Sequence, residues 1–393
     1  MHVLLVPSWY ATPDNPVRGS FFREQAHALV RGGHRVGVIA PELRSVRELP
    51  AGLAASARGI RFEDDLGVPT YRLDGVQLLP GLARGNDRAW VSAGRKLFAR
   101  YVAEQGTPDV IHAHAMFMGG IIGSELARRS GVPLVITEHS TVYQRRPIPA
   151  FQIEEARAAM STAEALLVVS PQLGEVMQHT LGSFAPPAEW VPNMVDGAFL
   201  SAPLNTRRGD GPFRFLNIAF LYEKKGHADL LAAFAERFGG DSGVQLRIGG
   251  DGPERVRLHA LADALGVSAQ VAWLGPLSRE AVLAEMGAAD AFVLSSRIET
   301  FGVVLIEALA CGLPVIATRS GGPECIVDER DGLLVEPGDV AGLGSAMEQL
   351  KTHAADYDAA DIRQRCDERF GENALVTKLE SVYTRAVSGG GQA

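Results

Sequence analysis

The hydrophobic pattern of this chain alternates between two kinds of segment. Short apolar runs, typical of strands buried on both faces of a parallel sheet, are followed by longer segments in which apolar residues recur at helical spacing. Such alternation predicts a parallel sheet covered by helices. In the first half, strands are expected at 2–6, 36–40, 110–113, 134–138 and 165–170, and helices at 21–31, 89–105, 119–129 and 153–162.

The same alternation restarts at Phe213. Residues 196–212 have the glycine, proline and charge content of an interdomain linker. We therefore expect an N-terminal domain at 1–195, a C-terminal domain at 213–371 and a final helix within 372–393. Ligands of open α/β sheets bind beyond the carboxyl ends of the strands, so two facing sheets predict one cleft. The second set of strands is expected at 213–220, 244–249, 271–274, 291–294 and 314–317, and the helices at 228–237, 254–265, 279–286 and 300–310.

Composition supports two ordinary globular domains. The chain has 393 residues, 46% hydrophobic and 21% charged, and its net charge of −8 combines +1 up to Val195 with −9 from Asp196 on. Neither half is strongly basic, which disfavours a nucleic-acid partner. The apolar run at 2–6 breaks at Pro7 and no run reaches the length of a membrane span, so a cytoplasmic protein is expected. The three cysteines lack CxxC spacing, which favours reduced thiols over a disulfide or a zinc site.

Two glutamates, Glu299 and Glu307, flank the predicted start of a helix at Thr300. Glu299 lies in the loop before this helix and Glu307 about two turns along it. Their carboxylates can therefore stand roughly 10 Å apart, with helix-end amides between them that favour an anion. This arrangement suits a nucleotide sugar, since one acid can hold sugar hydroxyls and the other a ribose diol. Taken alone, the same spacing also occurs on solvated helix faces.

The segment from Ala289 to Thr318 resembles the donor-site signature of the retaining glycosyltransferases of family 4, which have the GT-B fold. The resemblance covers most of the chain and is strongest from about 213 to 335. It implies two Rossmann-like domains facing a cleft, with the C-terminal helix crossing back to the N-terminal domain. It also assigns the ribose diol to Glu307 and the donor sugar hydroxyls to Glu299. The amides expected to face the diphosphate are those of Phe301, Gly302 and Val303.

The resemblance assigns further diphosphate contacts to Lys225 and Gly19. Lys225 precedes a predicted helix, where a cation can neutralise a leaving diphosphate. Many family members have an arginine five residues earlier, but this chain has Phe220; Lys224 or Arg18 are candidates to replace that charge. Gly19 ends a proline-rich loop, where many relatives have two glycines; the alternative is a turn glycine without a ligand.

Two histidines follow predicted strands. His114 matches a family residue beside the reacting carbon of the donor sugar, and His139 is expected on the acceptor side. The alternative is that both are structural. Neither has a partner at the helical spacing of a zinc site, and the acidic run 63–65 lies in a stretch expected to be irregular, so no metal requirement is expected.

We therefore expect a retaining, metal-independent glycosyltransferase that moves a hexose-type sugar from a nucleotide-diphosphate sugar, with His114, Lys225 and Glu299 as catalytic residues. A lipid-linked or polysaccharide acceptor in envelope glycan assembly is favoured, and a small-molecule acceptor is the alternative. A non-catalytic, sugar-nucleotide-binding regulatory subunit stays open as a different class. Acceptor contacts are expected from the loops 41–82 and 143–153.

The predicted helix 89–105 places apolar residues on one arc and basic residues on much of the remainder. Such a helix either covers its own sheet or contacts an anionic membrane peripherally at its inner face, and the sequence leaves both readings open.

Overall fold

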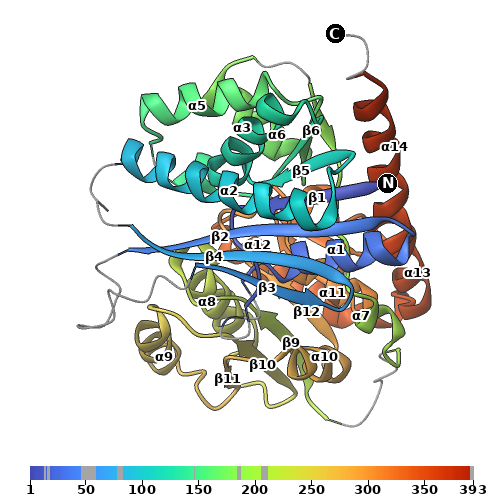
Figure 1. Ribbon diagram of the computed structural model, residues 1–393. Coiled ribbons are helices and arrows are strands. Elements are labelled where there is room, and N and C mark those ends of the chain that lie inside the picture. Colours follow the sequence, from blue (N-terminus) through green and yellow to red (C-terminus); the bar gives the residue numbers. More distant parts are fainter. Residues whose placement is uncertain are drawn as a thin grey trace. The chain divides into compact units, whose positions relative to one another are not determined.

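The computed structural model describes residues 1–12, 15, 18–45, 59–77, 83–145, 147–183, 187–204 and 211–389 (Figure 1). The chain forms two compact units. The first consists of Met1–Val169, Gly174–Val191 and the residues from Leu375 on, and the second of Ser170–Leu173 and Pro192–Ala374. Residues 205–210 of the expected linker, and 46–58 and 78–82 of the expected acceptor loops, lie outside the described residues.

The second unit begins ahead of the expected linker because the segment from Pro192 packs onto that unit. The amide of Val195 donates to the carbonyl oxygen of Phe370 at 2.8 Å. Phe199, in the short helix α7 (Gly197–Ser201), is 1% exposed. The first part of the expected linker is therefore folded structure rather than a spacer.

The described residues of the first unit form an eight-stranded sheet, in the order β3-β4-β2-β1-β5-β6-β7-β8. Its strands pair in parallel, except that β3 runs antiparallel to β4 at the edge. The strands are β1 (His2–Pro7), β2 (Arg35–Ser45), β3 (Gly59–Asp65), β4 (Val68–Gln77), β5 (Val110–His114), β6 (Leu134–Glu138), β7 (Ala165–Val168) and β8 (Ala188–Trp190).

The acidic run 63–65, expected in an irregular stretch, lies instead in the edge strand β3. Cross-strand pairing explains why this polar segment is extended. Glu63 accepts from Arg72 on β4 at 2.8 Å, and Asp65 pairs with Arg23 of helix α1 (Ser20–Arg31) at 2.5 Å. The carboxylates therefore hold the edge of the sheet.

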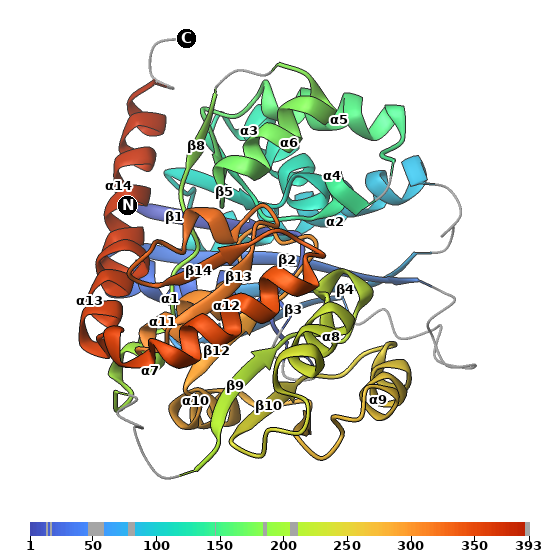
Figure 2. The ribbon, with the colours of Figure 1, turned by 180° about the vertical axis from the view of Figure 1, so that it is seen from behind.

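Helices cover both faces of this sheet. His112 and His114 on β5 face α1 and the C-terminal helix α14 (Glu372–Gly389), which lie beside each other in Figures 1 and 2. The last helix thus returns to the first unit, as expected, and Tyr383 anchors it to His112 by a hydrogen bond of 2.7 Å. The remaining helices of this unit are α2 (Ala83–Gln105), α3 (Ile121–Ser130), α4 (Val142–Arg145), α5 (Ala150–Met160) and α6 (Pro171–Leu181).

Helix α2 buries its apolar side chains against its own unit. Trp90, Leu97 and Tyr101 are 9%, 0% and 1% exposed, so these three side chains of the apolar arc pack inside the unit. Among the described helices, none is long and apolar enough to span a bilayer.

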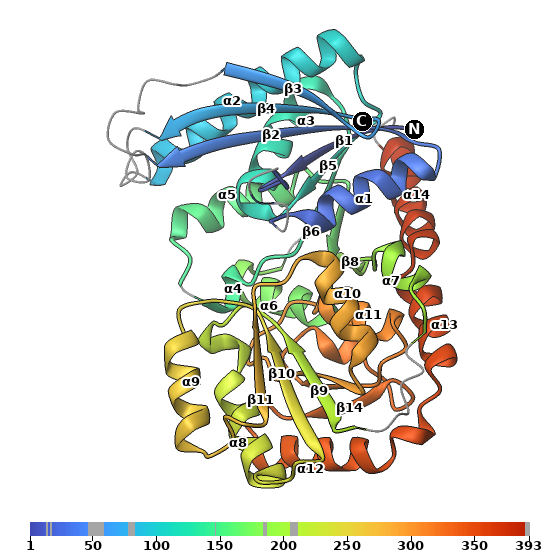
Figure 3. The same ribbon diagram turned by 90° about the horizontal axis from the view of Figure 1, so that it is seen from below.

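The described residues of the second unit form a six-stranded, all-parallel sheet in the order β11-β10-β9-β12-β13-β14 (Figure 3). A core of buried residues joins one face to helices α8, α9 and α12. This sheet and the mainly parallel sheet of the first unit confirm the α/β, doubly wound architecture predicted from the sequence. The elements are β9 (Phe213–Ile218), α8 (His227–Phe238), β10 (Val244–Gly249), α9 (Arg255–Ala264), β11 (Val271–Gly275), α10 (Arg279–Ala288), β12 (Ala291–Leu294), α11 (Val303–Ala310), β13 (Val315–Thr318), β14 (Gly332–Val335), α12 (Val340–Thr352) and α13 (Ala359–Phe370).

One boundary that matters for the site differs from the prediction. Helix α11 begins at Val303 and not at Thr300, because Gly302 caps it with φ 102°, a left-handed conformation that ends any earlier helical turn. Phe301 and Gly302 therefore belong to the loop that enters the helix, and the first helical amide is that of Val303.

Candidate functional site

The turn that carries Lys225 lies between β9 and α8 and packs closely on the loop after β12. Gly226 has φ 66°, and a Cβ added there would lie 1.9 Å from the carbonyl oxygen of Ser295. The hydroxyl of Ser295 in turn donates to the carbonyl oxygen of Lys225 at 3.1 Å. Because only glycine permits this approach, residue 226 fixes the position of Lys225 relative to the next loop.

The ammonium of Lys225 contacts the carboxylate of Glu299, with 2.5 Å between Nζ and Oε2. The two side chains are only 16% and 13% exposed. Glu299 is also fixed through its backbone, since its amide donates to the carbonyl oxygen of Ser320 at 2.9 Å. The structure thus brings together two residues, 74 positions apart, that the sequence predicted for the same site.

The start of α11 lies beside Glu299. A Cβ added at Gly302 would stand 3.6 Å from Cγ of Glu299, and one added at Gly322 would stand 2.3 Å from the backbone nitrogen of Phe301. The Phe301 ring is 1% exposed, which anchors the loop in the core. Glycines on both sides therefore let the loop run close to its neighbours at the amino end of α11, where the helix dipole favours an anion.

Glu307 lies on the same helix and is 6% exposed. Its Oε1 accepts from Nη1 of Arg279 at 3.0 Å. Nε of that guanidinium contacts Oδ2 of Asp196, also at 3.0 Å. Sequence reasoning missed Arg279, which lies 28 positions from Glu307 in an ordinary helix start and outside the motif. A paired, buried Glu307 is a group that the fold holds in one orientation.

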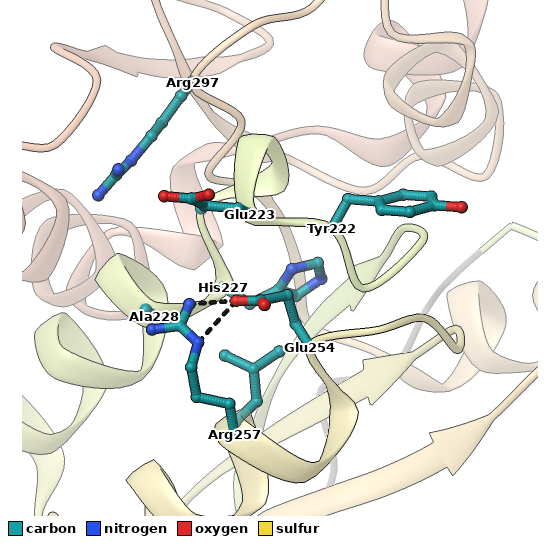
Figure 4. A pocket seen from close by; sticks show the side chains of 9 residues that line it. Tyr222, Glu223, His227, Ala228, Glu254, Arg257 and Arg297 are labelled. Carbon is teal, nitrogen blue, oxygen red and sulfur yellow. Dashed lines mark hydrogen bonds and ion pairs between the residues drawn. The ribbon is translucent and has the colours of Figure 1, made fainter.

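A shallow pocket of about 90 Å³ lies beside the Lys225 turn, between the amino ends of α8 and α9 (Figure 4). Glu254 points toward Arg257, with 2.7 Å to Nε, whereas the Tyr222 ring points away from that pair. The complete lining is Tyr222, Glu223, Gly226, His227, Ala228, Glu254, Arg257, Leu258 and Arg297.

His227 lines this pocket directly after the Lys225 turn and is 2% exposed. Burial, aided by the nearby Lys225 charge, lowers the pKa of His227 to about 4. The imidazole is therefore neutral near pH 7 and adds no second cation to Lys225. Phe220, at the position where the sequence resemblance led us to expect an arginine, is 59% exposed. Lys225 is thus a cation of this turn that contacts Glu299 directly.

The two candidate histidines lie together in the first unit. His114 is fully buried, and its Nδ1 is 3.2 Å from Nε2 of His139. Burial, with smaller effects from His112 and His139, lowers the pKa of His114 well below its usual value. His114 is therefore a neutral imidazole, with one nitrogen that donates and one that accepts hydrogen bonds.

Glu138 organises the loop that carries His139, a role that sequence reasoning missed. Its buried carboxylate accepts from the amides of Met116, His139 and Ser140 at 2.9, 2.8 and 2.7 Å, and from the Tyr143 hydroxyl at 2.9 Å. These four donors offset the cost of burying the group. A carboxyl at the end of a buried strand was the signal that the sequence offered.

Gly19 precedes α1 and has φ 81°. A Cβ added there would lie 3.0 Å from the carbonyl oxygen of Trp9, so a side chain would be strained and crowded. This geometry accounts for a glycine in the turn without a ligand, which was the alternative role for this residue. Residues 13–14 and 16–17 of the same loop lie outside the described residues.

Within the described ranges, no cluster of three or more histidine, cysteine, aspartate or glutamate side chains is arranged to hold a metal ion. The candidate residues fall into two groups. Lys225, Glu299 and Glu307 belong to the second unit, and Gly19, His114 and His139 to the first.

Comparison with known proteins shows which protein families the two halves of the chain match. Residues 19–199 match the family described as Glycosyltransferase Family 4, and residues 205–370 the family described as Glycosyl transferases group 1. These are two glycosyltransferase domains. The chain is therefore a glycosyltransferase, and the two matched ranges contain the candidate residues of both units.

Similar proteins cover nearly the whole glycosyltransferase chain. Glycogen synthase from Mycobacterium tuberculosis is 28% identical over 418 residues, which span 99% of this chain and 96% of that protein. D-inositol 3-phosphate glycosyltransferase from Pseudarthrobacter chlorophenolicus is 29% identical over 388 residues, 94% of this chain and 87% of that protein. The solved structure of sucrose-phosphate synthase from Thermosynechococcus elongatus superimposes with a TM-score of 0.77 at 23% identity, covering 99% of each chain. The chain has the GT-B fold that the sequence predicted.

Proposed function

We propose that this glycosyltransferase is retaining and metal-independent, and that it moves a hexose-type sugar from a nucleotide-diphosphate sugar to a lipid-linked or polysaccharide acceptor in envelope glycan assembly. One observation carries the proposal: the Lys225–Glu299 pair, 2.5 Å between charged atoms, lies at the amino end of the helix that carries the buried Glu307. A cation, a helix start and two acids in this order match the parts of a nucleotide sugar.

Each part of the donor has a partner in this arrangement. The ribose diol binds Glu307, and the diphosphate lies between Lys225 and the first amides of α11, where positive charge and the helix dipole favour it. The donor sugar then reaches Glu299. Donor binding draws Lys225 toward the diphosphate, and this exchange of partners releases the Glu299 carboxylate for sugar hydroxyls.

The proposed transfer needs no protein nucleophile. The bond between the anomeric carbon and the diphosphate oxygen breaks, and a bond from the acceptor oxygen forms on the same face of the sugar. The acceptor proton passes to the departing phosphate oxygen. Lys225 and the helix amides stabilise the charge that develops on the diphosphate, which is the role a metal ion plays elsewhere. The neutral His114 orients a donor-sugar hydroxyl, and His139 contributes on the acceptor side.

The relatives support two acceptor classes. A glycogen synthase that matches nearly the whole chain supports a polysaccharide acceptor, and a D-inositol 3-phosphate glycosyltransferase supports the small-molecule alternative. A non-catalytic, nucleotide-sugar-binding regulator is the remaining alternative, because Phe220 removes one expected charge from the diphosphate contacts.

Donor binding tests the proposal first. Thermal unfolding is measured with UDP-, GDP-, ADP- and dTDP-sugars for the wild type and for Glu307→Gln, which keeps the shape of the side chain. A ligand at about 100 times its Kd stabilises the folded state by about 2.7 kcal/mol. We expect a shift with one nucleotide class that Glu307→Gln loses.

The matched control is Glu336→Gln, which changes an exposed acid of the same unit that pairs with Arg319. It should keep the full shift. The absence of a shift with every donor, or an undiminished shift in Glu307→Gln, would refute the proposed donor site.

A further inference from the structure

Arg279, the first residue of α10, is held on two edges of its guanidinium. Nη1 lies 3.0 Å from Oε1 of Glu307, and Nε lies 3.0 Å from Oδ2 of Asp196. The guanidinium also lies over the ring of Phe199, 5.0 Å from its centroid. Its two polar edges and its flat face therefore each have a partner.

The partners of Arg279 are themselves fixed by the fold. Asp196 caps α7, because its Oδ1 accepts from the amide of Ala198 at 2.9 Å. Phe199 is 1% exposed, and the side chain of Glu307 is 8% exposed. Arg279 therefore joins a helix cap, a buried ring and a buried carboxylate, and its planar fork suits two carboxylate partners at once. A carboxylate bonded to such a fork is held in one rotamer.

The combined charge of Asp196, Arg279 and Glu307 is compatible with a hydroxyl-bearing ligand at Glu307. One guanidinium lies between two carboxylates, so the three groups together keep a net charge of about −1. The Arg279 contact lies on one oxygen of Glu307, Oε1. A carboxylate has two oxygens with about four acceptor positions between them, so a guanidinium on one oxygen can orient a group that also accepts from hydroxyls.

We infer that Arg279 is a positioning residue that fixes Glu307 to read the 2′- and 3′-hydroxyls of ribose, so that the protein discriminates ribonucleotide donors from 2′-deoxy donors. This inference rests on the proposed function, in which Glu307 binds the ribose. A hydrogen bond to a charged group contributes enough to separate two ligands by about tenfold or more. Without Arg279, Glu307 adopts several rotamers, and the difference in affinity between the ribonucleotide and the 2′-deoxynucleotide becomes smaller.

The opposite role, in which Arg279 competes with the ribose for Glu307, predicts the opposite result. Removal of a competitor would tighten nucleotide binding. The second anchor of Arg279, on Asp196, favours orientation over competition, because it holds the guanidinium in place whether or not a ribose is bound.

Calorimetry with UDP, ADP and GDP, each against its 2′-deoxy counterpart, tests the inference on the intact protein. The measured quantity is the ratio of the two Kd values. This ratio is insensitive to a loss of folded protein, because both ligands report on the same sample. For the nucleotide that binds, we expect the wild type to prefer the ribo form by about tenfold or more. Arg279→Ala should bring the ratio to within about twofold of one.

Arg279→Lys is the second variant, should the alanine variant not fold. Lysine keeps the charge but has no planar fork to hold both carboxylates, so it should lose part of the ratio. The matched control is Arg319→Ala, which removes an exposed ion pair with Glu336 in the same unit and should keep the wild-type ratio.

An unchanged ratio in both Arg279 variants, or tighter binding of the ribonucleotide, overturns the inference while leaving the proposed function intact. A wild type that binds no nucleotide, or a Glu307→Gln variant that keeps the ratio, overturns the proposed function and the inference with it.

Discussion

Gly226→Ala is predicted to displace Lys225, because the added methyl group would overlap a backbone atom that no side-chain movement can shift. The added Cβ would lie 1.9 Å from the backbone carbonyl oxygen of Ser295, whereas real Cβ atoms essentially never come within 3.0 Å of another heavy atom. One of the two backbone segments must therefore move by about 1 Å or more. Because the moving segment carries Lys225, the pair with Glu299 is disturbed as well.

The energetic cost of this steric overlap can be distinguished from the cost of placing alanine in a left-handed backbone conformation. Alanine in that conformation costs about 1–2 kcal/mol, and overpacking typically adds about 1–3 kcal/mol. Gly240 offers a matched control in the same unit, since it has φ 83° and a Cβ there would meet nothing within 4 Å. Gly240→Ala therefore bears the backbone cost alone, and the two variants should differ by about 1–3 kcal/mol in free energy of unfolding.

Thermal unfolding and calorimetry of nucleoside diphosphate binding provide the assay. Gly226→Ala should unfold about 2–12 °C below Gly240→Ala, because one kcal/mol corresponds to about 2–4 °C in a unit of this size. Gly240→Ala should bind the nucleotide like the wild type, and Gly226→Ala about tenfold more weakly or worse. Equal stability and equal binding in the two variants would refute the account of the Lys225 turn.

Three further measurements test the candidate site and the buried core of the first unit. Lys225→Met should lower the transfer rate about 100-fold or more, measured in steady state, because it removes the cation beside the leaving diphosphate; a rate near wild type would contradict that role. A chelator such as EDTA should leave the rate unchanged, and a loss of rate restored by Mg²⁺ would exclude a metal-independent reaction. Burial lowers the pKa of His112 to about 3, so the unfolded chain, with a pKa of about 6.5, takes up the proton first as the pH falls. The stability that His112 contributes is therefore complete above about pH 6.5 and about 2 kcal/mol smaller at pH 5, measured by urea unfolding as the difference between the wild type and His112→Gln. A difference that is equal at pH 7 and pH 5 would show that His112 does not titrate in this way.

Local patterns in the sequence were sufficient for much of this fold. Strands such as β5 and β12 are buried on both faces, and a continuous apolar run shows this without tertiary information. The two candidate donor-binding glutamates also follow a local rule, since Glu299 and Glu307 flank one helix start. The pairing of Lys225 with Glu299 follows from two strand ends at the same edge of a parallel sheet.

The features that sequence reasoning missed depend on distant partners. Strand β3 is largely exposed and polar, and its extended form depends on pairing with β4 rather than on an apolar run. The start of α11 at Val303 reflects a positive φ at Gly302, which composition does not reveal. Arg279 contacts Asp196 across 83 positions, and no motif predicts that contact.

The stereochemistry of donor hydrolysis tests the central claim most directly, because water serves as the acceptor and the natural acceptor need not be known. The donor identified by thermal unfolding is incubated with the enzyme, and the released sugar is followed by proton NMR before its anomers equilibrate. The account predicts release first in the anomeric configuration of the donor, at a rate that Glu299→Gln lowers. Release first in the inverted configuration would contradict a retaining reaction, and no release above background would favour the regulatory subunit.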